Sequence, residues 1–367
     1  MNNSTKSLLA IILISSILVK AVDETYITAT GSAYNNPLVN NLEATFNGLS
    51  TLPYLFYAKV DDVVTDYRYV LSAESPIDPQ TMMATHFQGL NRLPKHLGLD
   101  GYLIVSGSNL IDMRSEIYTL KEKDLETSTW KFKQETTLDT QGYWHAGGIQ
   151  VAGKYLAIPL EASDFATFWH SKVVFYDISN PLDPIKIDVE IQRPGVSGGS
   201  VALTRLVDGH FLVAVWSDAG PEGYQSKFDF YRSIDTTLEG GFTHIAAINK
   251  SDVAYQAIQF ILDENAVPYI IGTENDGMLG LAGTNHADLY QVVYSNNTVT
   301  DVVTKGSKPQ LCSISNFGAG AGVSIPDCDT IEIISCSHFI LTKDTSTEKF
   351  TEPTKLCFDK FGPAVFF

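Results

Sequence analysis

The amino-acid sequence predicts an all-β chain made of a repeated four-stranded unit. Three observations support this. Short apolar strands alternate with Gly, Asp and Pro turns, the same order of features recurs about every 50 to 60 residues, and no long stretch combines helical periodicity with paired caps. Four strands per period at this spacing are typical of a β-propeller. A β-sandwich also has many short strands, but it does not require a repeated order of features.

The first half of each unit is a pair of apolar strands joined by a turn. The clearest example, residues 145–161, reads HAGGIQVAGKYLAIPLE, and corresponding stretches begin at His86, Ser197, Tyr255 and Phe317. Each begins with an aromatic or polar residue followed by small residues. The second strands read YLIVSG, YLAIPL, FLVAVW, PYIIGT and IEIISC, and each ends in polar residues.

The second half of the unit supplies two further strands. The third strands alternate in the manner of half-buried strands and read SEIYTL, SKVVFYDI, SKFDFY and ADLYQVVY. The fourth strands are more polar and read WKFKQE, IKIDVEI, FTHIAAI and VTDVVTK. The strands therefore pair mainly with their sequence neighbours, as they do in a meander.

The length of the chain sets the number of blades. Five units are visible after residue 86, and residues 23–85, with YLFYAKV and YRYVLSA, supply most of a further one. We therefore predict six four-stranded blades, with five or seven as alternatives. The terminal KLCFDKFGPAVFF is apolar enough to be a closing strand, and pairing of the two chain ends in one blade would remove an open sheet edge.

On this strand pattern the chain resembles secreted β-propellers of the broad YVTN/WD-like superfamily. The resemblance covers nearly all of the chain after its N-terminus, although the Gly-His and Trp-Asp dipeptides of WD repeats are not in register here. It implies a ring of blades around a central channel. It implies no activity, because propellers host many unrelated functions.

The N-terminus has the features of a secretory signal peptide. Lys6 precedes the apolar run LLAIILISSILV, and small residues stand before a cleavage site after Ala21. The run is too short to cross a membrane as a helix. We therefore predict a signal peptide at 1–21, a single propeller domain at 22–367, and a secreted protein, extracellular or periplasmic, with no membrane span after cleavage.

Export would expose the cysteines to an oxidising compartment and, in a eukaryote, the sequons to glycosylation. All four cysteines lie in the last part of the chain, at spacings that fit no zinc motif: Cys312, Cys328, Cys336 and Cys357. In an oxidising compartment we expect at least one disulfide, with the pairing left open. The sequons at Asn249 and Asn296 are glycosylation acceptors only in a eukaryotic host.

The charge of the chain limits its partners. A formal net charge of −17 argues against a nucleic-acid-binding protein, because phosphates require a basic face. We expect a monomer that takes a small molecule or a protein ligand at one mouth of the channel.

The first strand of a propeller blade lines the channel, so the starts of the units should gather at one mouth. The candidate ligand-binding residues on first strands are His86, Gln88, His145, Gln150, Ser197, Tyr255 and Gln259. The polar ends of the second strands face the same mouth and are Ser106, Ser108, Asn109, Glu161, Asp218, Glu274, Asn275 and Asp276. Among the second-strand residues, Glu161 and Glu274 are the preferred ligand-binding candidates. Glycines such as Gly89, Gly147 and Gly148 allow the backbones to approach closely at the axis.

These residues support two functions. The first is a binding or interaction module with a polar pocket at the channel mouth. The alternative is a propeller hydrolase of the phosphoesterase, lactonase or esterase type, in which His86, His145 and Glu161 act in acid–base or ligand roles. No catalytic residue and no metal ligand is assigned. A divalent cation such as calcium suits converging carboxylates and histidines, but the sequence TENDG lacks the ligand spacing of an EF-hand.

One motif suggests a nucleophile but lacks its context. Residues 195–199 read GVSGG and match the G-x-S-x-G nucleophile elbow, which requires a helix after the serine. A strand hairpin follows here, and Ser197 occupies the position that His145 holds in the preceding unit. We therefore do not expect Ser197 to be a nucleophile.

The predicted signal peptide has a direct test. N-terminal sequencing or intact mass of the exported protein should place the first residue at or near Val22, because the cleavage site follows Ala21. An exported protein that keeps the hydrophobic N-terminus would contradict the prediction.

Overall fold

The computed structural model describes most of the chain after residue 37. The described residues are 38–52, 55–60, 63–68, 71–74, 85–93, 101–109, 113–124, 129–139, 142–162, 170–218, 225–251, 253–275, 284–311, 315, 317–336 and 355–363. The signal peptide expected at 1–21 lies outside them. Among these residues no helix is long and apolar enough to cross a membrane.

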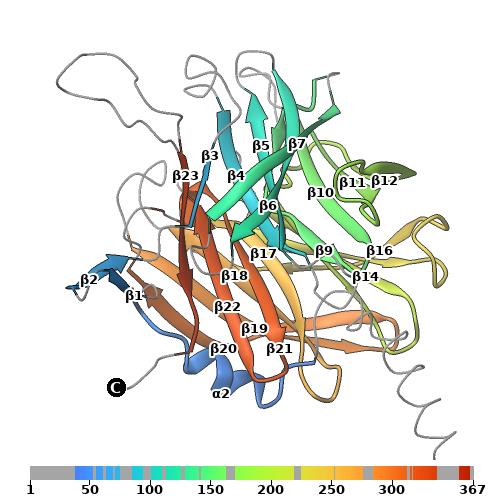
Figure 1. Cartoon of the computed structure of the whole chain (residues 1–367). Coiled ribbons are helices and arrows are strands. Elements are labelled where there is room, and N and C mark those ends of the chain that lie inside the picture. Colours follow the sequence, from blue (N-terminus) through green and yellow to red (C-terminus); the bar gives the residue numbers. More distant parts are fainter. Residues whose placement is uncertain are drawn as a thin grey trace, which may run out of the picture.

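Apart from one two-stranded sheet, the described strands fall into five antiparallel groups with four strand positions each, which we name blades I to V (Figure 1). Parallel strand pairs at the ring closure join the first and last groups into one continuous sheet. Blade I consists of β4 (Thr85–Arg92), β5 (Tyr102–Asn109), β6 (Arg114–Asp124) and β7 (Thr129–Asp139). Blade II consists of β8 (His145–Ala146) and β9 (Gln150–Ala152), which share the first position, β10 (Tyr155–Ala162), β11 (His170–Asp177) and β12 (Ile185–Arg193). Blade III consists of β13 (Ser200–Arg205), β14 (Phe211–Ser217), β15 (Lys227–Ser233) and β16 (Phe242–Asn249).

The last two blades complete the ring. Blade IV consists of β17 (Tyr255–Leu262), β18 (Pro268–Asn275), β19 (Asn285–Ser295) and β20 (Thr298–Gln310). Blade V consists of β21 (Ala321–Asp327), β22 (Thr330–Cys336), β23 (Lys355–Phe361) and β3 (Leu71–Glu74). The β-propeller predicted from the repeat is therefore confirmed, and every predicted unit start lies within a few residues of a first strand.

The two ends of the chain close the ring. The C-terminal β23 pairs with the N-terminal β3 in blade V, and β3 also pairs in parallel with β7 of blade I (Figure 1). At the axis, Ala321 of β21 bridges to Gly89 of β4. The prediction that the apolar C-terminal segment closes the ring together with the N-terminal segment is confirmed.

The predicted number of blades, six with five or seven as alternatives, is not confirmed. Within the described residues the strands form five groups of four. Residues 23–85 were expected to supply most of a sixth blade, but their described part forms a two-stranded sheet of β1 (Leu55–Val60) and β2 (Val63–Arg68), and the single strand β3. The reason is that blade V has only three strands of its own, so the N-terminal segment supplies its fourth.

Apolar side chains fill the spaces between neighbouring blades. Separate core clusters lie between blades I and II, II and III, III and IV, and IV and V. The short helix α2 (Leu42–Asn47) covers the last of these with two buried side chains, Leu42 and Phe46, and the 3-10 turn Phe317–Ala319 packs there as well. Burial of this apolar surface is the main favourable term in the folding of each blade pair.

Three amide side chains close the axis of the ring. Gln150 donates to the carbonyl of Phe260 (2.8 Å) and accepts from the amides of Leu203 (2.9 Å) and Phe260 (2.8 Å). This side chain alone links blades II, III and IV.

The other two amides complete the connection. Gln259 donates to the carbonyls of Ile149 (2.9 Å) and Leu90 (3.3 Å) and accepts from the amide of Val323. Asn91 donates to the carbonyl of Val323 (3.1 Å) and accepts from the amide of Val151 (2.7 Å). Together the three side chains join the first strands of all five blades.

These contacts correct part of the channel prediction. Gln150 and Gln259 were expected to bind a ligand, but each is only 2% exposed and its amide is occupied by backbone groups of other blades. Gln88 is also buried on its first strand. Gln150 and Gln259 therefore belong to the packed axis, because the first strands approach closely enough to bond through one side chain.

Glycines permit this approach, as predicted. A Cβ on Gly147 would fall on the carbonyl oxygen of Gly199, and one on Gly148 would lie 2.8 Å from the Cα of Ala257. Gly148 also forms a parallel bridge with Ser200 of the next blade.

Two of the four cysteines can be placed. Cys328 is exposed and Cys336 is buried, and both are free thiols. Burial raises the pKa of the Cys336 thiol to about 12. The thiols of Cys312 and Cys357 lie outside the described side chains, so the expected disulfide stays a prediction for that pair.

Replacement of Gly148 by valine should destabilise the whole ring. The new side chain would overlap backbone atoms of blade IV, and overpacking of a close contact costs about 1 to 3 kcal/mol or more. Thermal unfolding measures the effect. Gly199→Ala is the matched control, because its Cβ would meet only the Asp218 carboxylate at 3.8 Å, and it should leave the melting temperature nearly unchanged. Equal melting temperatures for the two variants would contradict the close packing.

Candidate active site

One mouth of the ring collects the starts of the first strands and the ends of the second strands. The strand register fixes this arrangement, because His145 lies opposite Glu161 in blade II, and Tyr255 lies opposite Glu274 in blade IV. In blade III the equivalent position is Asp218, directly after β14. We name Glu161, Asp218 and Glu274 the carboxylate cluster.

Glu161 is the most enclosed member of this cluster. It is 5% exposed, and both of its oxygens accept hydrogen bonds: one from His145 Nδ1 at 2.9 Å and one from the backbone amide of Gly198 at 2.6 Å. Burial by itself raises the pKa of Glu161. The hydrogen bond and charge of His145, the Gly198 amide and the charge of Arg193 outweigh burial and hold the pKa below its ordinary value.

Asp218 has the opposite shift. Its carboxylate accepts one hydrogen bond, from Trp216 Nε1 at 2.7 Å. The pKa of Asp218 is raised to about 6, and burial is the largest cause. The hydrogen bond from Trp216 and the charge of His145 lower it, while the negative charges of Glu161 and Glu274 raise it. Glu274 in turn accepts the backbone amide of Ala254 at 2.8 Å.

The two shifts produce a proton donor and a proton acceptor at one mouth. Near pH 5, Glu161 is ionised while Asp218 still holds its proton. Pairs of titratable groups whose environments separate their pKa values are the usual acid and base of an active site. The arrangement is therefore suited to acid–base catalysis.

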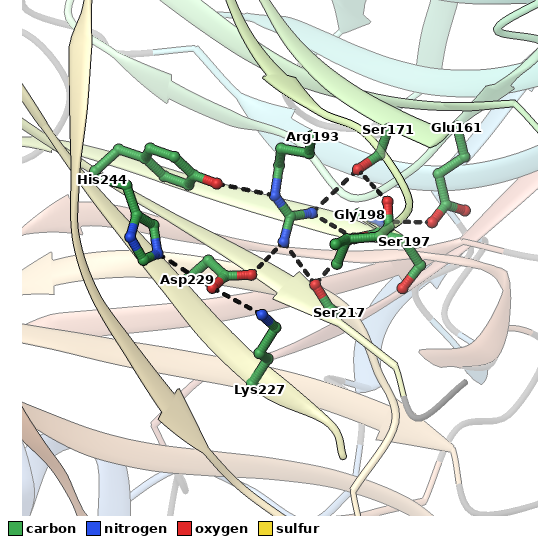
Figure 2. Close-up of polar contacts among 11 residues, drawn as sticks. Glu161, Ser171, Arg193, Ser197, Gly198, Ser217, Lys227, Asp229 and His244 are labelled. Atoms are coloured by element: carbon green, nitrogen blue, oxygen red, sulfur yellow. Dashed lines mark hydrogen bonds and ion pairs between the residues drawn. The ribbon is translucent and has the colours of Figure 1, made fainter. Parts of the chain in front are cut away.

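A buried arginine lies behind Glu161 (Figure 2). Arg193 ends β12 and pairs with Asp229 of blade III, and its guanidinium also donates to the backbone oxygen of Ser197. Residue Ser197 lies in segment 194–199, which connects β12 to β13 and carries the Gly198 amide. The support of Glu161 therefore extends into the interface between blades II and III.

The structure brings together some of the residues that the sequence predicted. His145, Glu161 and Glu274 lie at the mouth, as does Asp218, which was named among the second-strand ends. Trp144 lies next to His145, with 5.6 Å between the ring centroids. The side chain of His86 and residue Asp276 lie outside the described part.

Other predicted residues have structural roles. Tyr255 is fully buried between blades III and IV, where its ring packs on Trp216 and its hydroxyl donates to Asp288 at 2.8 Å. It was expected to bind a ligand, but no part of it is accessible. Its ring fills the space that Gly272 leaves open, since a Cβ there would lie 2.6 Å from the ring.

The serines of blade I also have structural roles. Ser106 Oγ donates to the carbonyl of Gly147 at 2.6 Å, and Ser108 Oγ accepts from the amide of Ala146 at 3.2 Å. Both hydroxyls thereby join the second strand of blade I to the first strand of blade II. Both hydroxyls bond to backbone groups of blade II, so their role is structural.

Ser197 does not have the setting of a nucleophile. It lies in a connection that leads into strand β13, as the sequence predicted, and its buried hydroxyl has no hydrogen-bond partner within the described part of the chain. Its backbone oxygen is the group that makes contacts, with Arg193 and with Ser217 Oγ at 2.9 Å. The described residues also contain no group of three or more His, Cys, Asp or Glu placed to hold a metal ion.

Sequence reasoning missed Arg193 and Asp229. A signal was available for Arg193, because it continues the inward positions of Ile187 and Ile191 on β12. Asp229 alternates with Phe228 and Phe230 on β15, so the pattern places it on the other face and gives no such signal. A charged residue at an inward position of an alternating strand is buried, and buried charges are paired.

Comparisons with known proteins give structural neighbours but no family. No protein-family model and no curated protein sequence matches the chain. Similar solved structures include the GH43_1 enzyme from Xanthomonas citri (9% identity, TM-score 0.42, covering 76% of this chain and 89% of that one). They also include CoXyl43, a GH43 β-xylosidase/α-arabinofuranosidase from a compost microbial metagenome in complex with xylotriose (12%, 0.42, 79% and 94%), and the haemagglutinin-neuraminidase of Parainfluenza Virus 5 (7%, 0.39, 85% and 82%). The propeller assignment follows from the strand pairing described above.

Replacement of Asp218 by asparagine should stabilise the protein at pH 7 and not at pH 4. Because the folded state raises the pKa of Asp218 from 3.8 to about 6, it binds more protons than the unfolded chain within this window. Stability is therefore lost as the pH rises through it. Each pKa unit is worth about 1.4 kcal/mol, so the gain at pH 7 should be about 3 kcal/mol.

Urea unfolding at the two pH values measures this gain. Asparagine keeps an oxygen that can accept from Trp216, so that contact is retained. The exposed Asp188 provides a control, because Asp188→Asn should not change stability in this pH-dependent way. An Asp218→Asn variant that is less stable than the wild type at pH 7 would contradict the raised pKa.

Proposed function

We propose that this chain is a hydrolase that cleaves glycosidic bonds with a pair of carboxyl groups. The observation that carries the proposal is the opposite ionisation of Asp218 and Glu161 at one mouth of the propeller. Glycoside hydrolysis is the reaction class that uses one protonated and one ionised carboxyl group on either side of the scissile bond.

Asp218 is the general acid in this proposal. With a pKa of about 6 it holds a proton in weakly acidic solution and gives it to the leaving oxygen. Glu161 is the anionic partner. Its two hydrogen bonds leave each oxygen a further lone pair for a water molecule or for the developing positive charge of the sugar.

The charge of the mouth separates this reaction from other hydrolyses. A phosphoester is anionic and would meet Glu161 and Glu274, so the phosphoesterase class fits poorly. Esterases and lactonases of the serine type require a hydroxyl next to a base, and Ser197 lacks that contact among the described residues. A neutral saccharide meets neither obstacle. In this proposal the mature chain, residues 22–367, acts as a secreted monomer.

A binding module is the second candidate. The observation in its favour is that His145, Glu161 and the Gly198 amide already satisfy one another. Such a module would bind a saccharide or another ligand at the same mouth without turnover.

Hydrolysis of neutral aryl glycosides by purified residues 22–367 tests the proposal. The rate should fall about tenfold per pH unit above pH 6, because Asp218 loses its proton there. Asp218→Asn should lower the rate by about 100-fold or more for phenyl glycosides and by much less for 2,4-dinitrophenyl glycosides, whose leaving group needs no proton.

Two further variants sharpen the test. Glu161→Gln removes a negative charge beside Asp218 and should therefore lower the pKa of Asp218. The alkaline limb of any remaining activity should then shift to lower pH. The exposed Glu239→Gln is the matched control and should leave the rate unchanged. Saturable binding of oligosaccharides with no turnover of any glycoside would contradict the hydrolase and favour the module.

A further inference from the structure

Arg193 occupies a position that the strand pattern reserves for an apolar side chain. It is the last residue of β12, it is 3% exposed, and it lies on the same face as the buried Ile187 and Ile191. Removal of a guanidinium from water is costly unless all of its donors are used.

The guanidinium uses all three of its nitrogens across the interface of blades II and III (Figure 2). Its hydrogen-bond acceptors are Tyr231 Oη (3.2 Å), Ser171 Oγ (3.1 Å), Ser217 Oγ (2.7 Å), the Asp229 carboxylate and the backbone oxygen of Ser197. Arginine suits this position because its planar fork addresses several acceptors at fixed angles.

Asp229 balances the charge of this network. Its second oxygen lies 3.2 Å from Lys227 Nζ and 3.3 Å from His244 Nε2 (Figure 2). Asp229 therefore keeps Lys227 as a cationic partner even when Arg193 is replaced. Of the three residues Arg193, Lys227 and His244, only Arg193 also contacts the oxygen of Ser197.

The contact with Ser197 acts on Glu161 through a single peptide group. The oxygen of Ser197 and the amide of Gly198 belong to the same planar unit, in which they point in opposite directions. Arg193 and Ser217 hold the oxygen, while the amide donates to Glu161 at 2.6 Å. A rotation of this peptide that breaks the first contact also breaks the second.

The neighbouring peptide is held in the same way. Ser171 Oγ donates to the carbonyl of Val196 at 2.8 Å and accepts from Arg193. A Cβ on Gly198 would lie 2.8 Å from Ser171 Oγ and 2.9 Å from Arg193 Nη1, so glycine is required for the segment to approach the guanidinium.

We infer that Arg193 is a positioning residue for the carboxylate cluster: it fixes the peptide between Ser197 and Gly198 so that the amide faces Glu161. Arg193 itself touches no reacting atom. Its importance for catalysis rests on the proposed function, whereas its effect on Glu161 does not and can be measured without a substrate.

The ionisation of Glu161 provides that measurement. The charged groups that act on it are His145 and Arg193, and the carboxyl of Asp218 interacts with it across the mouth. Carboxyl-¹³C NMR titration of labelled protein reports the Glu161 pKa directly. Assignment follows from the signal lost in Glu161→Gln.

Arg193→Lys separates position from charge. Lysine keeps the positive charge but lacks the fork, so the peptide should be released and the Glu161 pKa should rise by about one pH unit, a tenfold change in the ionisation constant. If glycosidase activity is present, its acid limb should move to higher pH by the same amount. An unchanged Glu161 pKa in folded Arg193→Lys would show that charge alone matters and would overturn the inference.

Two further variants keep the test decisive if Arg193→Lys does not fold. Ser217→Ala removes the other hydrogen bond to the Ser197 oxygen and one acceptor of Arg193, but keeps the guanidinium and its contact with Ser197, so the Glu161 pKa should rise by a smaller amount. Lys227→Met removes a cation from Asp229 without touching the peptide and should leave the Glu161 pKa unchanged. A Glu161 pKa that rises more in Lys227→Met than in Ser217→Ala would overturn the inference.

Discussion

Three buried amide side chains at the axis are the interactions on which the rest of the structure depends. Gln150, Gln259 and Asn91 bond to backbone groups of blades other than their own and join all five first strands. The apolar layers between the blades contribute more free energy to folding. The hydrophobic effect is non-directional, however, so it does not fix the position of one blade relative to the next along the ring axis. Directional amide contacts fix that position, and an unpaired partner would cost about 1 to 3 kcal/mol each.

The fixed position of the blades along the axis determines which carboxyl groups meet at the mouth. Because the first strands cannot slide, the second strands of blades II, III and IV end at the same level and bring Glu161, Asp218 and Glu274 together. Like charges in such a group cannot all be ionised at low cost. Burial contributes most to the raised pKa of Asp218, so in weakly acidic solution the proton remains on Asp218 and leaves Glu161, whose carboxylate accepts hydrogen bonds from His145 and the Gly198 amide.

Sequence patterns predicted the fold and the mouth better than the individual roles. Repeat starts such as His145 and Tyr255 correspond to first strands, and the polar second-strand ends include the whole carboxylate cluster. The roles of Gln150 and Gln259 could not be read from the sequence, because a polar residue facing an axis has the same pattern whether the axis is open or closed. Arg193 was missed for a related reason: its partners come from distant strands and the segment that follows it, which strand alternation does not connect.

The glycines of segment 194–199 explain why this chain contains a nucleophile-elbow motif without the elbow. Gly195 has a left-handed φ of 75°, which favours glycine at the turn out of β12. Gly198 has no room for a Cβ beside Arg193, and the oxygen of Gly199 accepts the amide of Gly148 at 3.0 Å where the two blades meet. Each glycine therefore meets a backbone requirement of the interface between blades II and III. The serine between them contributes its backbone oxygen to Arg193, so the motif marks a peptide held in place and not an exposed hydroxyl.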